Sequence, residues 1–173
     1  MTVRRALLSS VSGDVIELGA GDGKSLPYYP YRSMTSLTLV DRRFSKAVHR
    51  HEFGETPVTL LTRLPDTLPF DKCTFDCACL FFALSELAEP YRALSELRRI
   101  LRPGGRVLFL DHTRPSGPAS ILFNGVNLLQ RVTSRGTVNR NRNIPAMLEV
   151  AGFHIVNISS PGGMMVFGEA ERI

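Results

Sequence analysis

The sequence predicts an α/β domain built around a mostly parallel β-sheet. Short apolar runs alternate with segments whose apolar residues recur at helical spacing, which is the pattern of βαβ units. The runs are continuously apolar, as expected for strands that are covered on both faces. The length of 173 residues suits one core. We therefore expect a single domain over residues 1–173, with residues 1–13 as a short N-terminal extension.

The elements follow one another in a regular order. Five apolar runs are expected to form strands, at residues 14–18, 36–41, 57–62, 75–84 and 106–111. The segments between them predict helices at residues 22–29, 42–51 and 90–101. The third helix should end at the sequence RPGG, residues 102–105, because proline and paired glycines do not continue a helix.

The C-terminal part predicts one more helix and two more strands, at residues 143–153, 154–160 and 164–172. Only Pro161, Gly162 and Gly163 join the two strands. A link this short connects antiparallel neighbours, whereas parallel strands need a long crossover. The last strand should therefore run antiparallel to the strand before it.

Composition limits the classes of protein to consider. The formal net charge is +5, and a basic surface can meet nucleic acid, anionic lipid or an acidic substrate. The densest basic group, residues 131–143, contains no aromatic residue to stack on bases, so nucleic acid is a disfavoured partner. The three cysteines have no second cluster to complete a metal site, and no metal is expected. Reduced thiols fit the cytoplasm, with an organelle matrix as the alternative.

A glycine-rich loop follows the first predicted strand, in the sequence VIELGAGDGK of residues 15–24. Its spacing is G-x-G-x-G, which differs from the dinucleotide fingerprint, and Glu17 precedes the first glycine by two residues. A carboxylate there disfavours a pyrophosphate and favours an ammonium group. Asp41 ends the second predicted strand, where a carboxylate can accept both hydroxyls of a ribose. S-adenosylmethionine has the ribose and the positive charge that these residues imply.

The motifs VIELGAGDGKSLPYY, LTLVDRR, LPDTLPFDKCTFDCACLFFAL and ELRRILRPGGRVLFLDH resemble those of class I S-adenosylmethionine-dependent methyltransferases. They are similar to the methyltransferase type 11 branch, which includes quinone and thiol methyltransferases. The resemblance covers residues 14–111. It implies a Rossmann-like fold, with a seven-stranded, mostly parallel sheet, an antiparallel last strand and helices on both faces.

The resemblance also implies roles for individual residues. Glu17 would hold the methionyl amino group, the glycine loop would pass beneath the cofactor, and Asp41 would bind the ribose. Phe81 and Phe82 would lie beside the sulfonium, although core packing is an alternative for both. The residues expected to bind cofactor are Glu17, Gly19, Ala20, Gly21, Gly23, Asp41, Arg42, Leu64, Pro65, Asp66, Phe81 and Phe82.

One segment departs from the family pattern. Family members often place an acidic residue after the third strand, where it takes the adenine amino group and the next backbone N–H caps the ring. Here Leu64 replaces the acid, and Pro65 has no N–H to donate. Adenine would have to be recognised differently, for example through Asp66, or the cofactor would bind weakly.

Asp111 and His112 follow the fifth predicted strand and are the candidates for a catalytic base; the alternative is that both only bond to loop backbone. The predicted reaction is methyl transfer to a small or lipid-like molecule, such as a quinol, a thiol, an amine or a phospholipid head group. The alternatives are a non-catalytic methyltransferase-fold scaffold or partner subunit, and an RNA methyltransferase guided by arginines.

An apolar stretch at residues 119–132 precedes the arginines of residues 131–142. Together they suit an amphiphilic substrate, so residues 116–143 are expected to form a lid over the methyl group. The alternatives are a packed helix, peripheral contact with a membrane, or a lid completed by a partner chain or a second copy in a homodimer.

Overall fold

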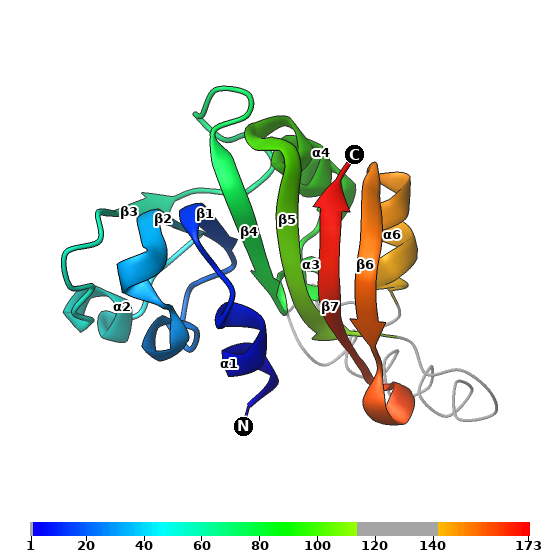
Figure 1. Ribbon diagram of the computed structural model, residues 1–173, viewed down its shortest axis with the longest axis horizontal. Coiled ribbons are helices and arrows are strands. Elements are labelled where there is room, and N and C mark those ends of the chain that lie inside the picture. Colours follow the sequence, from blue (N-terminus) through cyan, green and yellow to red (C-terminus); the bar gives the residue numbers. More distant parts are fainter. Residues whose placement is uncertain (1, 114–141) are drawn as a thin grey trace.

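The structure is a computed structural model, and it describes residues 2–113 and 142–173. Its centre is one seven-stranded sheet with the order β3-β2-β1-β4-β5-β7-β6. The pairs from β3 across to β5 are parallel, and β7 runs antiparallel to both β5 and β6 (Figure 1). The predicted fold class and the antiparallel last strand are therefore confirmed.

The strands are β1 (Gly13–Leu18), β2 (Met34–Asp41), β3 (Val58–Thr62), β4 (Phe75–Phe81), β5 (Leu101–His112), β6 (Phe153–Ser159) and β7 (Met165–Arg172). The α-helices are α1 (Val3–Leu8), α2 (Lys46–Arg50), α3 (Ala83–Glu86), α4 (Pro90–Ile100) and α6 (Ile144–Val150). Three short 3-10 turns complete the described elements, at Leu26–Tyr28, Tyr31–Ser33 and Pro161–Gly163.

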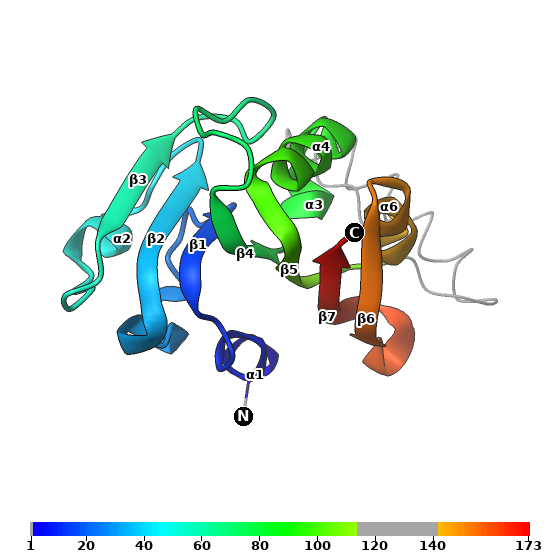
Figure 2. The same ribbon diagram turned by 45° about the horizontal axis from the view of Figure 1, so that its top comes forward.

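The two faces of the sheet pack against different elements. In Figure 2, α3, α4 and α6 lie on one side of the sheet and α1 lies on the other. Alternate residues of β1 divide between two apolar clusters, with Ile16 in the cluster that includes α4 and Val15 in the cluster that includes α1. Both are fully buried. This burial on both faces explains why the strands read as continuous apolar runs.

Two predicted helices are shorter in the structure. Residues 22–29 were expected to be helical, but only the 3-10 turn Leu26–Tyr28 forms, because Gly23 has a φ of +74° and the sequence holds Pro27 and Pro30. The helix expected at residues 42–51 is reduced to α2. The Asp41 carboxylate accepts a hydrogen bond from the Arg43 amide at 3.1 Å, and this turn delays the start of the helix.

Two strand boundaries also differ from the prediction. The strand expected to reach residue 84 ends at Phe81, because Phe82 adopts left-handed backbone with a φ of +62° and α3 begins immediately after it. The fifth strand begins at Leu101 instead of residue 106. α4 does end before the RPGG sequence, at Ile100, as predicted.

The N-terminal extension forms α1, which packs against the domain. Leu8 of α1 is fully buried, and Val11 just after it is 1% exposed. The Arg106 guanidinium of β5 donates to the Ser10 carbonyl at 2.9 Å and to the Ser10 hydroxyl at 2.8 Å. These contacts hold α1 against the face of the sheet opposite α4, and Arg4 of α1 lines the cavity described below (Figure 2).

Candidate functional site

A cavity of about 390 Å³ lies at the carboxyl ends of β1, β2 and β4. It is lined by Arg4, Glu17, Gly19, Gly21, Asp22, Lys24, Ser25, Asp41, Phe81, Phe82, Glu86 and His112. A larger open groove, of about 1180 Å³, is formed by residues 30–35 and 54–57 at the amino ends of β2 and β3. Open parallel sheets bind ligands at the carboxyl ends of their strands, so the smaller cavity is the candidate site.

The glycine loop and Asp41 hold each other in place. Gly19 has a φ of +82°, a conformation that few other residues adopt, and its amide donates to the Val40 carbonyl at 2.8 Å. The Gly21 amide donates to Asp41 Oδ2 at 2.8 Å. A Cβ added at Gly21 would come within 2.8 Å of that same oxygen and 3.1 Å of the Arg43 carbonyl oxygen, so glycine favours this close approach. The loop is therefore shaped around the Asp41 carboxylate.

Glu17 is a buried carboxylate at the floor of the cavity. It is 2% exposed, and its two oxygens accept hydrogen bonds from the Ser25 hydroxyl at 2.6 Å and from the Tyr29 hydroxyl at 2.8 Å. Burial raises the pKa of Glu17 from its ordinary 4.5 to about 6, although both hydrogen bonds and the charge of Arg4 oppose the rise. The carboxylate is thus charged at neutral pH, but its hydrogen bonds and the charge of Arg4 do not fully offset the cost of burying that charge.

The lining of the cavity is predominantly acidic. Its carboxylates are Glu17, Asp22, Asp41 and Glu86, against the two permanent cations Arg4 and Lys24. Lys24 pairs with Asp22 at 2.5 Å, although both side chains are largely exposed. Burial raises the pKa of Glu86, as do the charges of Asp111, Asp41 and Asp22. A lining of this charge favours a ligand that carries positive charge.

Two aromatic rings and an imidazole form one wall. Phe81 and Phe82 end β4, and the Arg4 guanidinium lies over their rings at 5.3 Å and 5.9 Å from the ring centres. The ring centres of Phe82 and His112 are 5.0 Å apart. Left-handed backbone at a phenylalanine is strained, and such strain is concentrated at functional sites.

Asp111 does not line the cavity, unlike its neighbour His112. It is fully buried, and its carboxylate accepts hydrogen bonds from the Ser85 amide at 3.0 Å and from the His112 amide at 2.7 Å. Burial raises the pKa of Asp111. Its hydrogen bonds to two backbone amides agree with the alternative considered from the sequence, in which the carboxylate bonds to backbone, and they tie it to α3 and to His112.

The substitution Asp111→Asn is expected to destabilise the fold by about 1–3 kcal/mol, because the amide nitrogen cannot accept the second backbone N–H and leaves it buried without a partner. Chemical denaturation would measure the loss, with the exposed Asp71→Asn as the matched control. Equal stability of the two variants would contradict this role.

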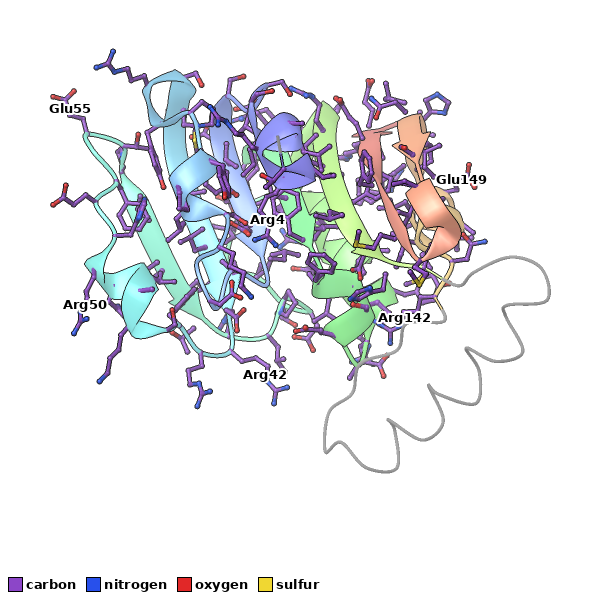
Figure 3. All side chains as sticks on the ribbon, turned by 90° about the horizontal axis from the view of Figure 1, so that it is seen from below. Arg4, Arg42, Arg50, Glu55, Arg142 and Glu149 are labelled. Atoms are coloured by element: carbon purple, nitrogen blue, oxygen red, sulfur yellow. The ribbon has the colours of Figure 1, made fainter. Side chains whose placement is uncertain are left out.

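The other predicted site residues are distributed unevenly. Glu17, Gly19, Gly21, Asp41, Phe81, Phe82 and His112 all line the cavity, whereas Ala20, Gly23, Arg42, Leu64, Pro65, Asp66 and Asp111 do not. Arg42 is exposed and points outward at the periphery (Figure 3). Leu64 is 47% exposed, and Pro65 is buried. The contacts with adenine that were predicted for Leu64, Pro65 and Asp66, in the loop after β3, therefore remain predictions.

Five lining residues were not predicted from the sequence. Ser25 is only eight residues after Glu17, and its position just after the glycine loop is the one sequence feature that could have placed it in the site. Lys24 and Asp22 lie within the loop itself. Arg4 and Glu86 belong to α1 and α3, and only the packing of those helices brings them to the cavity.

The predicted lid, residues 116–143, lies almost entirely outside the described residues. At its end, the Arg142 guanidinium donates to the Leu84 carbonyl, and the Thr113 hydroxyl donates to the Arg142 carbonyl at 3.4 Å. Within residues 2–113 and 142–173, no helix has the length and apolar character that crossing a bilayer requires.

Comparison with known proteins identifies relatives in sequence and in structure. The chain is 34% identical over 117 residues to a phosphatidylethanolamine N-methyltransferase of Cereibacter sphaeroides, covering 65% of this chain and 58% of that protein. It is 27% identical over 136 residues to a demethylmenaquinone methyltransferase of Clavibacter sepedonicus, covering 76% and 54%. The chain thus spans little more than half the length of these relatives.

A crystal structure of a putative methyltransferase from Bacillus halodurans has the same fold, with a TM-score of 0.75 and 14% identity, covering 98% of this chain and 96% of that one. A family model described as a methyltransferase domain matches residues 16–109, which is just over half of the chain. The matched residues contain the glycine loop, Glu17, Asp41 and the Phe81–Phe82 wall. The chain therefore belongs to the methyltransferase domain family.

Proposed function

We propose that this protein binds S-adenosylmethionine in the cavity and transfers its methyl group to a small or lipid-like acceptor. The observation that carries the proposal is the placement of two carboxylates in one cavity, Glu17 on its floor and Asp41 against the glycine loop. An ammonium group pairs with the first, and a ribose diol donates to the second.

The charge of the cavity supports this ligand over a nucleotide. A pyrophosphate would be repelled by the four carboxylates of the lining, whereas S-adenosylmethionine carries one more positive than negative charge. The Glu17 carboxylate is held as an acceptor by Ser25 and Tyr29 and has no cation paired to it among the described residues. The ligand's ammonium would supply that missing charge.

The transfer needs little covalent participation from the protein. An electron pair of the acceptor would form a bond to the methyl carbon while the carbon–sulfur bond breaks, and the sulfonium would leave as a neutral thioether. Holding the two reactants in line supplies much of the catalysis. Phe81 and Phe82 line the cavity beside the place proposed for the sulfonium, and the Arg4 guanidinium lies over their rings.

His112 is the better placed of the two predicted bases, because it lines the cavity whereas Asp111 is buried behind it. It would accept the proton that an amine, thiol or quinol acceptor must lose. Glu86 lies in the same lining and is a second group that could receive a proton there. Asp111 would then act as a positioning residue through the His112 backbone.

The acceptor is proposed from the relatives together with the chemistry of the cavity. Two relatives are named for lipid-like acceptors, phosphatidylethanolamine and demethylmenaquinone. One acceptor is a phospholipid amine and the other a quinone precursor, so the property proposed for the acceptor is an apolar body with a polar reacting end.

The proposal is tested with methyl-labelled S-adenosylmethionine and a panel of quinols, thiols, amines and phospholipids. We expect label transfer to at least one lipid-like acceptor, and we expect His112→Gln to reduce turnover at least tenfold while cofactor affinity changes less than twofold. Cofactor binding without transfer to any acceptor would favour the non-catalytic scaffold. Transfer to RNA alone, with affinity that falls steeply with salt, would favour the RNA methyltransferase.

A further inference from the structure

The cavity has an acidic floor for an ammonium group, and the helix predicted directly after the glycine loop is absent beside it. The N–H groups at the start of such a helix would favour a ligand carboxylate. That helix does not form, and the segment contains only the three-residue turn Leu26–Tyr28. If an amino-acid group binds here, its carboxylate must meet another donor.

Arg4 of α1 is the cation best placed to meet it. Arg4, labelled in Figure 3, lines the same cavity as Glu17, and its guanidinium lies over the rings of Phe81 and Phe82. The other permanent cation in the lining, Lys24, is already paired with Asp22 at 2.5 Å. No salt bridge to Arg4 is present within the described part of the chain.

The position of Arg4 is set by well-packed structure. α1 is anchored by buried Leu8 and by the hydrogen bonds from Arg106 to Ser10. Arg4 is half-buried, whereas the next residue, Arg5, is exposed and does not line the cavity. The helix therefore directs one of two adjacent arginines into the site.

We infer that Arg4 forms a carboxylate subsite, so that an amino-acid group of the ligand lies between Arg4 and Glu17. This inference rests on the proposed function and assigns the N-terminal helix to the binding site. A guanidinium and a carboxylate form paired, charge-assisted hydrogen bonds, while Glu17 in the same lining pairs with the ammonium. Such a site selects ligands that carry both charges on one carbon.

The test compares ligands that differ only in the carboxylate. Affinities for S-adenosylmethionine and for its decarboxylated analogue are measured by calorimetry with the wild type, Arg4→Gln, Arg4→Lys and the matched control Arg5→Gln. We expect Arg4→Gln to weaken S-adenosylmethionine binding by about tenfold or more and to change analogue binding less than twofold. Arg5→Gln should match the wild type for both ligands, and Arg4→Lys should recover part of the loss.

Each contrary result has a distinct meaning. Equal weakening of both ligands by Arg4→Gln would overturn the subsite, because the residue would then act through the fold or the aromatic wall. Unchanged or tighter binding of S-adenosylmethionine would overturn it too, since Arg4 would then be irrelevant or would compete with the sulfonium. If the wild type bound neither ligand, the proposed function would fail and the subsite with it. Thermal melting of each variant identifies a loss that comes from unfolding.

Discussion

The substitution Asp41→Ala is expected to weaken S-adenosylmethionine binding by about 2–3 kcal/mol, or 30- to 150-fold, and to leave the fold intact. Two losses combine in this variant. The ribose loses the carboxylate that would accept its hydroxyls, and the Gly21 and Arg43 amides lose the acceptor that shapes the loop. Both amides lie near the surface, so water can replace the carboxylate and the cost in stability should be small.

Calorimetry with S-adenosylmethionine and S-adenosylhomocysteine measures this effect, and both ligands should lose affinity equally because both carry the ribose. Glu55→Ala is the matched control, since Glu55 is an exposed carboxylate on the loop before β3, outside the candidate cavity (Figure 3). Unchanged affinity in Asp41→Ala would remove the ribose from this position. The affinity of Asp41→Asn should fall between that of the wild type and that of Asp41→Ala, because one acceptor oxygen remains.

Glu17→Gln is expected to stabilise the free protein while weakening its binding of S-adenosylmethionine. The pKa of Glu17 rises from 4.5 to about 6 on folding, because burial disfavours the charged form. The folded state therefore binds more protons than the unfolded state between these values, and stability falls as the pH rises through that window. Above pH 6 the buried charge costs about 2 kcal/mol, which the neutral glutamine removes. The Ser25 and Tyr29 hydroxyls, unlike backbone N–H groups, can accept a hydrogen bond from the new amide nitrogen.

Denaturation of both proteins from pH 4 to pH 8 tests the first half of this prediction. The variant and the wild type should be similar near pH 4, and the variant should be more stable by about 2 kcal/mol at pH 7–8. Ser25→Ala is an informative comparison, because it removes a hydrogen bond to the carboxylate without removing its charge. A variant less stable than the wild type at pH 8 would show that Glu17 has a structural role instead.

The affinity for S-adenosylmethionine should rise with pH, whereas the stability of the fold falls with pH. Only the charged carboxylate pairs with an ammonium, so wild-type affinity for S-adenosylmethionine should fall by about tenfold for each pH unit below 6. Glu17→Gln should bind more weakly at pH 8 and lose this dependence on pH. A wild-type affinity that is constant from pH 5 to pH 8 would contradict the pairing. A charge that destabilises the fold and strengthens binding is the usual property of a functional residue.

The sequence by itself determined the sheet and most of the cofactor side of the site. Continuous apolar runs specify strands buried on both faces, and the residues just after such strands meet at one edge of a parallel sheet. Glu17, Gly21 and Asp41 could be predicted for this reason, because their distance from a strand end is encoded locally. The short link at Pro161–Gly163 likewise predicted the antiparallel pairing of β6 and β7.

Only the tertiary structure decided which residues complete the cavity. Arg4 reaches it because Leu8 packs α1 against the domain, and Glu86 reaches it because Phe82 turns the chain into α3. Asp111 and His112 are adjacent in sequence, yet one is fully buried and the other lines the cavity, because successive residues of a strand point to opposite faces. These outcomes depend on contacts between residues distant in sequence, which no local pattern records.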